Sequence, residues 1–554
     1  MPHDPNEHRK DDELSGGPTA PVRERHPAGL PLLFVTEMWE RFSYYGMRAI
    51  LVLYMLTPLS SDQPNALEGG LGWTERIAGP VYGWYTALVF LLPLWGGMLA
   101  DKLLGTHRSM VIGGLIIIAG HTCLAFMGLF EPGSNATIVV FFAGLALVIV
   151  GTGFFKPCVS VMVGQLYRQG DPRRDAGFTF FYMGINIGAF AGILGCGYLG
   201  ESVGWHWGFG AAGVGMALGL IVYLIGRPAL LADVGLPPKD PAPIGRTLST
   251  ILGTMAAVGV VVVLYVCLTY LGETPIEARY GWMGWADWLD NTWAKRLEIA
   301  TIIGATIVVL LIISLFIAAQ SSQERGPTLA LFIIAFFVLF FWLAFEQAGS
   351  SLNQFAMDRT DRNIFGNWLF PASWLQSVNP LMILIFAPLF ASMWTGLARR
   401  RRDPNIAIKI GIGLLFVGAG FGLMVFAGIK SDGGASLSTD TQPILVGWWW
   451  LGGMYVMHTW GELCLSPIGL SLTTKLAPRK WVSLMMGVWF LAPAVAQLIG
   501  GYTFGAVKEI QQAGVLGVYG IGGYFLLFVL VGVIPGVTII LLTPLMKRLI
   551  GDRA

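Results

Sequence analysis

Long apolar runs recur from Leu30 almost to the C-terminus, and they limit the fold more than any other feature of the chain. A helix needs roughly 20 apolar residues to cross a lipid bilayer. The runs predict helices at 30–57, 77–101, 109–129, 137–167, 175–200, 207–226, 247–271, 298–320, 326–356, 370–396, 405–429, 443–475, 482–506 and 518–546. We therefore expect an all-α integral membrane protein with fourteen transmembrane helices.

The composition points the same way. Of the 554 residues, 55% are hydrophobic and only 12% are charged, whereas about 25% of a soluble domain is charged. This excludes one or two ordinary globular domains, and we expect no nucleic-acid partner. All cysteines lie in apolar runs without paired spacing, so we expect small buried side chains rather than disulfides or metal ligands, and no cofactor. They are Cys123, Cys158, Cys196, Cys267 and Cys464.

The loop charges indicate an orientation, because Lys and Arg gather in cytoplasmic loops. If the N-terminus is inside, the basic loops all fall on the cytoplasmic side, and the opposite loops carry mainly Asp and Glu. The cytoplasmic bases are Arg23, Arg25, Lys102, Arg108, Arg168, Arg173, Arg174, Arg227, Lys239, Arg246, Arg399 to Arg402, Lys475, Arg479, Lys480, Lys547 and Arg548. We expect a multi-pass protein of the cytoplasmic membrane with both termini in the cytoplasm.

The Pro-rich polar stretch 227–246 divides the chain. We expect a disordered cytoplasmic tail at 1–29, a six-helix bundle at 30–227, a linker with two extra helices at 228–325, a second six-helix bundle at 326–547 and a tail at 548–554. Two pseudo-symmetric six-helix halves are typical of secondary transporters. The extra pair has almost no internal charge, which predicts a peripheral, lipid-facing role.

The first predicted helix contains the sequence EMWERFSYYGMR. An ionisable group inside a span is costly unless it is paired or hydrated, so each one is a candidate functional residue. Glu37 and Arg41 are four residues apart, as are Glu40 and Tyr44, and Tyr44 and Arg48. The charges therefore lie along one stripe of the helix, which indicates more than a structural ion pair.

Three further charges lie deep in other predicted helices: Lys156, Glu346 and Glu462. At 1.5 Å per residue, Glu40, Arg41 and Lys156 are all roughly 15 Å from the cytoplasmic ends of their helices, and Arg48 and Glu346 are both about 27–30 Å from theirs. The matching depths predict a Glu/Arg/Lys cluster and an Arg48–Glu346 pair, which we expect to act as a gate between the two halves.

The charge count suggests proton coupling. The carboxylates Glu37, Glu40, Glu346 and Glu462 outnumber the cations Arg41, Arg48 and Lys156 by one. A buried carboxylate without a partner tends to hold a proton.

At these residues the chain resembles the proton-dependent oligopeptide transporter family of the major facilitator superfamily. The first-helix segment Glu37-x-x-Glu40-Arg41-Phe-Ser-Tyr-Tyr-Gly is similar to that family's signature, and GGMLADKLLGTHR resembles the superfamily's loop motif. GTGFFKPCVSVMVGQLY, FTFFYMGINIGAF and GELCLSPIGLS resemble further family segments. The resemblance covers residues 30–547 and implies a proton-coupled symporter that imports di- and tripeptides by alternating access, as a monomer.

The resemblance also implies site residues in a central cavity. The peptide-binding residues are expected to be Arg41, Tyr45, Arg48, Tyr85, Lys156, Asn186, Trp342, Asn379, Glu462, Trp489 and Phe490. From the charges and depths above, we expect proton coupling at Glu37, Glu40, Arg41, Lys156 and Glu346, and gating at Arg48 and Glu346. Some relatives carry a histidine in the second helix that is linked to proton movement; here there is none, which shifts the expectation for coupling to the carboxylates.

Three other classes stay open at this point. A channel would need a continuous polar stripe on several helices, whereas the polar residues here are few and clustered. A transporter of another small anion, metabolite or drug would share the fold, although the Glu-x-x-Glu-Arg pattern and Glu462 favour peptides. A membrane-embedded enzyme would need a nucleophile, a metal cluster or an acid–base pair, and the sequence has no HExxH or GxSxG motif.

Overall fold

The structure is a computed structural model of the full chain. It describes residues 26–59, 69–168, 171, 173–238, 240–245, 247–249, 252–253, 307, 310–366, 368–433, 443–478 and 480–551, except the side chains at 364–365, 466–471, 474 and 482–484. All structural statements below concern these residues. Residues 1–25 of the predicted tail at 1–29 lie outside them, as do most of the two extra helices at 247–271 and 298–320.

The helices of the first half are long and follow one another with short connections. They are α1 (Gly29–Leu56), α2 (Glu75–Leu99), α3 (Gly105–Phe126), α4 (Asn135–Gln165), α5 (Arg174–Ser202) and α6 (Trp205–Leu230). A π-helical turn at Ala100–Leu104 joins α2 to α3, and a 3-10 turn at Met127–Leu129 follows α3. We call residues 29–230 the N-half.

The second half contains more interruptions. Its helices are α10 (Ser322–Phe345), α11 (Ser351–Asp358), α12 (Val378–Arg399), α13 (Ile406–Ser431), α14 (Trp449–Leu476), α15 (Val482–Gly505), α16 (Val507–Ala513), α17 (Gly520–Leu541) and α18 (Thr543–Ile550). The 3-10 turns η4 (Glu346–Gly349) and η5 (Ala372–Ser377) precede α11 and α12. We call residues 322–550 the C-half.

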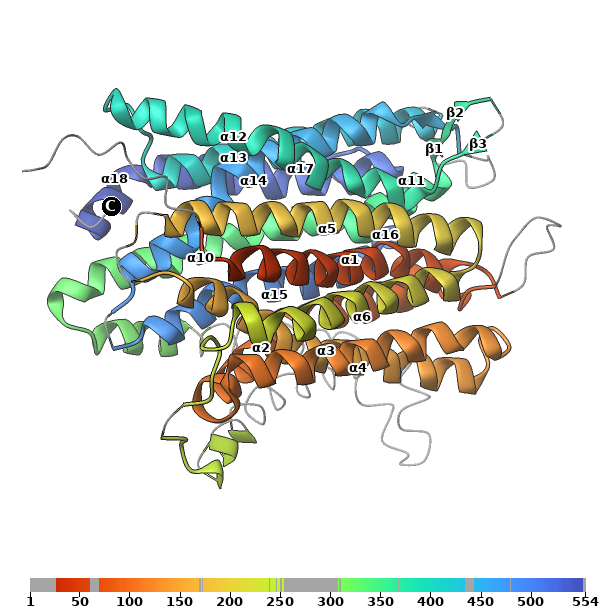
Figure 1. The fold of residues 1–554 in the computed structure, drawn as a ribbon. Helices are drawn as coiled ribbons and strands as arrows, with labels where there is room; N and C mark the ends of the chain where they lie inside the picture. The colour runs from red at the N-terminus through yellow and green to blue at the C-terminus, as the bar shows by residue number, and fades with distance from the viewer. Residues whose placement is uncertain are drawn as a thin grey trace, which may run out of the picture.

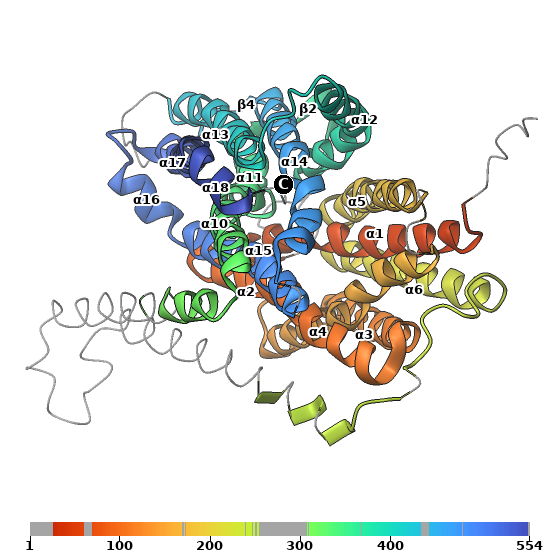
Figure 2. The same cartoon turned by 90° about the vertical axis from the view of Figure 1, so that its left-hand side faces the viewer.

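The long helices lie roughly side by side, with the N-half and the C-half on opposite sides of the molecule (Figures 1 and 2). Short strands mark one end of the bundle, which we call the strand end: β1 (Thr360–Asp361) pairs with β4 (Val446–Gly447) in parallel, and β2 (Asn363–Phe365) pairs with β3 (Trp368–Leu369). The opposite end carries α18, and we call it the tail end.

Nine helical segments within the described ranges are long and apolar enough to cross a membrane. Helix α1 has 28 residues and is also long enough, but it carries Glu37, Glu40, Arg41 and Arg48. The all-α transmembrane fold is therefore confirmed, while the count of fourteen helices stays a prediction.

Glycines allow close helix packing, both within the N-half and between the halves. On α5, Gly184, Gly188 and Gly192 recur every four residues and face α1, and a Cβ at Gly188 or Gly192 would meet the α1 backbone. Small residues at this spacing are typical of tightly packed transmembrane helices. Between the halves, α2 and α15 meet in the same way, because a Cβ at Gly79 or Gly501 would meet the backbone of the other helix.

Two expected boundaries differ in the structure. The helix predicted at 326–356 ends at Phe345 and restarts at Ser351, with Ser350 at φ −124° and ψ −98° between them. The predicted tail at 548–554 begins too early, because α18 extends to Ile550, whose side chain is buried with that of Met546. A search for apolar runs cannot detect such a helix break. The backbone groups freed at the break are buried in the protein, where other side chains satisfy them.

Candidate functional site

The charged stripe of α1 forms a compact ion-pair group in the middle of the N-half. Arg41 Nε lies 2.9 Å from Glu37 Oε1 and 2.5 Å from Glu40 Oε2, and all three side chains are at most 7% exposed. The spacing explains the contact with Glu37, because residues four apart in a helix share a face. One guanidinium thus serves two carboxylates, and the group holds one excess negative charge when both are ionised.

A second ion pair joins the two halves nearer the strand end. Arg48 on α1 forms an ion pair with Glu346, the first residue after α10. Its Nε donates to Tyr82 Oη of α2 over 2.8 Å. The break after α10 shapes this contact, because a Cβ at Gly349 would collide with Tyr82 Oη. The expected Arg48–Glu346 pairing is present, while its role in gating or peptide binding stays a proposal.

Gln347 holds the turn that presents Glu346. Its Oε1 accepts from Ser351 Oγ over 2.7 Å and from Tyr524 Oη over 3.1 Å. Its Nε2 donates to the backbone oxygen of Gly500 over 3.4 Å. These buried contacts tie the turn to α17 and α15, so the Glu346 carboxylate is positioned by its neighbours in the C-half.

Lys156 on α4 lies outside the first ion-pair group. Its Nζ is 4.0 Å from the centroid of the Phe90 ring on α2, a cation–π contact. Within the described part of the chain, no carboxylate lies within ion-pair distance of this ammonium. The expected cluster of Glu, Arg and Lys is therefore only partly assembled in this conformation. Lys156 is half-buried and forms no ion pair with a described carboxylate.

Glu462 on α14 has uncharged partners. Its Oε2 accepts from Asn379 Nδ2 of α12 over 3.0 Å, and the same amide nitrogen lies 3.0 Å from Thr459 Oγ1. The Tyr182 side chain also hydrogen-bonds Glu462 from α5 of the N-half. No cation among the described residues forms an ion pair with Glu462, so this carboxylate has only uncharged hydrogen-bond partners there.

The remaining predicted residues are spread over both halves. Asn186 is buried and donates from Nδ2 to the Tyr182 backbone oxygen, one turn earlier in α5, over 2.9 Å. Tyr85 and Trp489 are buried, while Tyr45, Trp342 and Phe490 are half-buried. Trp342 packs edge-on against Phe341 and Phe345 of its own helix.

Sequence reasoning missed Tyr82, Tyr182 and Gln347. Tyr82 precedes Tyr85 by three residues, and Tyr182 precedes Asn186 by four, so each shares a helix face with a predicted residue. That spacing could have identified both tyrosines. Gln347 gave no such signal, because its role depends on a break in the helix that the apolar pattern does not show.

Comparisons with known proteins agree with one another. A family model described as the POT family matches residues 107–522. The chain is 37% identical over 498 residues to "Peptide transporter YePEPT" of Yersinia enterocolitica, covering 88% of this chain and 89% of the relative. It is 32% identical over 530 residues to "Di-/tripeptide transporter" of Lactococcus lactis subsp. cremoris, covering 95% and 97% of the two chains.

The fold is likewise similar to that in a crystal structure of a "peptide transporter POT in complex with sulfate". The TM-score is 0.74 at 36% sequence identity, and the match covers 95% of this chain and 96% of the other. The paired charges on α1 and α10, the two helical halves and these matches agree, and we conclude that this chain belongs to the POT family of membrane transporters.

Proposed function

We propose that the protein imports di- and tripeptides together with protons by alternating access. The observation that carries this proposal is the separation of opposite charge between the halves. The N-half provides the Lys156 ammonium, which forms no ion pair with a described carboxylate. The C-half provides Glu462, whose partners in the described structure are uncharged. A short peptide is a zwitterion, so its carboxylate suits Lys156 and its ammonium suits Glu462, and charge-assisted contacts are the strong ones.

The aromatic residues expected in the site suit a substrate with variable side chains. Tyr45, Trp342 and Phe490 are half-buried, and Asn379 already contacts Glu462. Aromatic rings offer large apolar surfaces that tolerate different side chains. The names of the similar transporters from Yersinia and Lactococcus support a peptide substrate. Another small anion or metabolite is the alternative substrate class, and we propose a transporter rather than an enzyme.

Proton coupling can arise from the ion-pair group on α1. A peptide carboxylate bound at Lys156 would add a negative charge near Glu37 and Glu40, which share the single guanidinium of Arg41. Like charges disfavour the ionised form of a carboxylic acid. Peptide binding would therefore favour protonation of Glu37 or Glu40, and by linkage protonation would favour peptide binding.

The loop charges give the orientation. The basic connections near Lys102, Arg173 and Arg400 lie at the tail end, so by the positive-inside rule this end faces the cytoplasm. The strand end then faces outward, with both termini inside and the protein in the cytoplasmic membrane as a functional monomer. In this orientation the Arg48–Glu346 pair closes the outer side of the cavity.

Uptake of labelled di-alanine into proteoliposomes tests the proposal. With an inward proton gradient we expect accumulation above the external concentration, and without the gradient only equilibration. Unlabelled tripeptides should compete with the label. If the vesicles contain folded protein and no di- or tripeptide accumulates, peptide–proton symport is rejected.

A further inference from the structure

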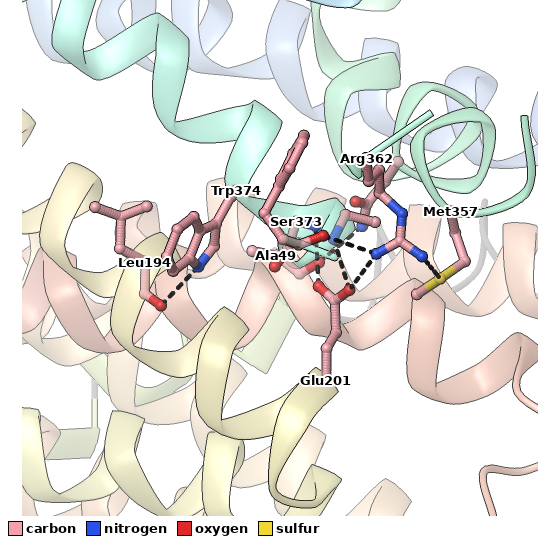
Figure 3. A network of polar contacts seen from close by, with 10 residues as sticks. Ala49, Leu194, Glu201, Met357, Arg362, Ser373 and Trp374 are labelled. Carbon is pink, nitrogen blue, oxygen red and sulfur yellow. Dashed lines mark hydrogen bonds and ion pairs between the residues drawn. The ribbon is translucent and has the colours of Figure 1, made fainter. Parts of the chain in front are cut away.

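A second buried carboxylate joins the halves at the strand end, away from Arg48 and Glu346. Glu201, near the end of α5, reaches into the C-half (Figure 3). Its Oε2 accepts from the backbone N–H of Ala372 over 2.6 Å, and its Oε1 accepts from that of Ser373 over 2.9 Å. These are the first two residues of η5, whose N–H groups have no partner inside their own turn. A side chain of the N-half thus caps a helical segment of the C-half.

A cation of the C-half completes this contact. Arg362 Nη1 lies 3.8 Å from Glu201 Oε2, and the Glu201 side chain is only 5% exposed. Arg362 is itself fixed by its own half, because its Nη1 donates to the Phe370 backbone oxygen over 2.9 Å and its Nη2 lies 3.4 Å from Met357 Sδ. The Glu201 carboxylate therefore faces one guanidinium and two backbone N–H groups, all of which belong to the C-half.

The face of α5 around Glu201 is shaped for this approach. Gly197 lies one turn before Glu201, and a Cβ there would collide with Ser373 Oγ. Another turn back, the Leu194 backbone oxygen accepts from Trp374 Nε1 over 2.9 Å. On α1, the Ala49 backbone oxygen accepts from Asn353 Nδ2 over 2.7 Å. In each of these contacts the C-half donates and the N-half accepts.

We propose that Glu201 is a second gating residue, which holds the strand end of the cavity closed independently of the Arg48–Glu346 pair. Among the described residues its partners all belong to the C-half, so the fold of the N-half does not require the contact. A carboxylate suits a contact that must break and reform, because water hydrates it when the strand end opens. This inference rests on alternating access in the proposed function, but its main test requires no transported substrate.

The test measures the distance between the halves at the strand end. Cysteines replace Leu129 in the N-half and Leu445 in the C-half, which are 77% and 56% exposed, in a background with Cys123 and Cys267 replaced by alanine. Spin labels on both positions report the closed and open populations by pulsed electron spin resonance. E201Q keeps the shape and removes the charge, and we expect it to raise the open-to-closed ratio about tenfold, the effect of losing one charge-assisted contact.

A matched variant controls for the loss of a carboxylate. Glu131 is an exposed acid of the N-half at the same end and forms no ion pair in the described part of the chain, so E131Q should leave the distances unchanged. Arg362→Gln should also raise the open-to-closed ratio, but by less than E201Q does. The reason is that Arg362 lies 3.8 Å from Glu201, farther than the backbone N–H groups that E201Q also affects. Wild-type distances in folded E201Q, or an equal shift in E131Q, would overturn the proposal.

Transport kinetics give a second readout. If more molecules are open to the outside, external peptide finds a competent site more often, so KM should fall while kcat also falls because closure is slower. A purely structural defect would lower kcat without lowering KM. If the wild-type protein transports no peptide at all, the proposed substrate is wrong, but the distance measurement still decides the role of Glu201.

Discussion

Arg48 on α1 and Glu346 at the end of α10 are 298 residues apart in the sequence and form a buried ion pair between the two halves. Tyr82 accepts a hydrogen bond from the same guanidinium over 2.8 Å, so the arginine is held by α2 as well as by the C-half. Removing one partner leaves the other charge buried without compensation, which costs about 3–5 kcal/mol.

The first prediction concerns this pair. Arg48→Ala and Glu346→Ala should each abolish uptake driven by a proton gradient, because an uncompensated buried charge disfavours the closed strand end. Lys508→Ala is the matched control, because Lys508 pairs with Glu75 across the same interface at 2.9 Å but is 65% exposed. The Lys508 ammonium is largely in solvent, and Glu75 keeps a hydrogen bond from Gln354, so this variant should retain most of its uptake. Equal losses in all three variants would contradict a special role for the buried pair.

The second prediction concerns the amino end of the peptide. Glu462→Gln keeps the hydrogen bond to Asn379 within reach but removes the charge that would face the ammonium. Binding of free dipeptides should weaken by about ten- to a hundredfold, the range for one charge-assisted contact. N-acetylated dipeptides lack that ammonium and should lose little further affinity. The measurement is calorimetric titration of both ligands on purified protein, and equal losses for the two would refute this assignment.

The third prediction concerns coupling. Lys156→Ala should remove accumulation driven by a proton gradient more completely than it removes peptide counterflow without a gradient. Lys156→Arg should fail as well, because a planar guanidinium does not replace a compact ammonium against the Phe90 ring and a single carboxylate. Both assays use the same proteoliposomes. Uphill accumulation at a normal rate in Lys156→Ala would show that the carboxylates of α1 couple the proton by themselves.

The fourth prediction concerns the packing of α1 on α5. At Gly192 a new Cβ would meet the Phe42 backbone, which cannot move aside without shifting the helix. Gly192→Ala should destabilise the protein by about 1–3 kcal/mol, seen as a fall in Tm of several degrees. Gly195 lies on the same helix, and its Cβ would come no closer than 3.4 Å to the end of the Phe42 ring. Gly195→Ala should therefore leave the Tm nearly unchanged, and a similar fall in both variants would disprove this packing effect.

The transmembrane fold and several charged positions could be predicted because their signals are local. Twenty apolar residues give a span wherever they occur, and four-residue spacing places Glu37 beside Arg41 without reference to any other helix. Depth along a helix depends on rise per residue alone, so Arg48 and Glu346 could be matched before their contact was known. Proline in a helix interior usually kinks or breaks the helix, yet α14 continues through Pro467. Packed neighbours can satisfy the backbone groups that a proline frees.

The sequence by itself determined that the chain folds into membrane-spanning helices, which charges lie in those helices and on which helix face each of them stands. Those properties follow from hydration and helical periodicity, and both act over a few residues. Only the tertiary structure decided that α10 breaks at Glu346, that Lys156 rests on Phe90 rather than on an acid, and that Glu201 caps η5 of the opposite half. Each of these depends on which surfaces meet across hundreds of residues, and the free energy of such a contact is set by the partner that buries it.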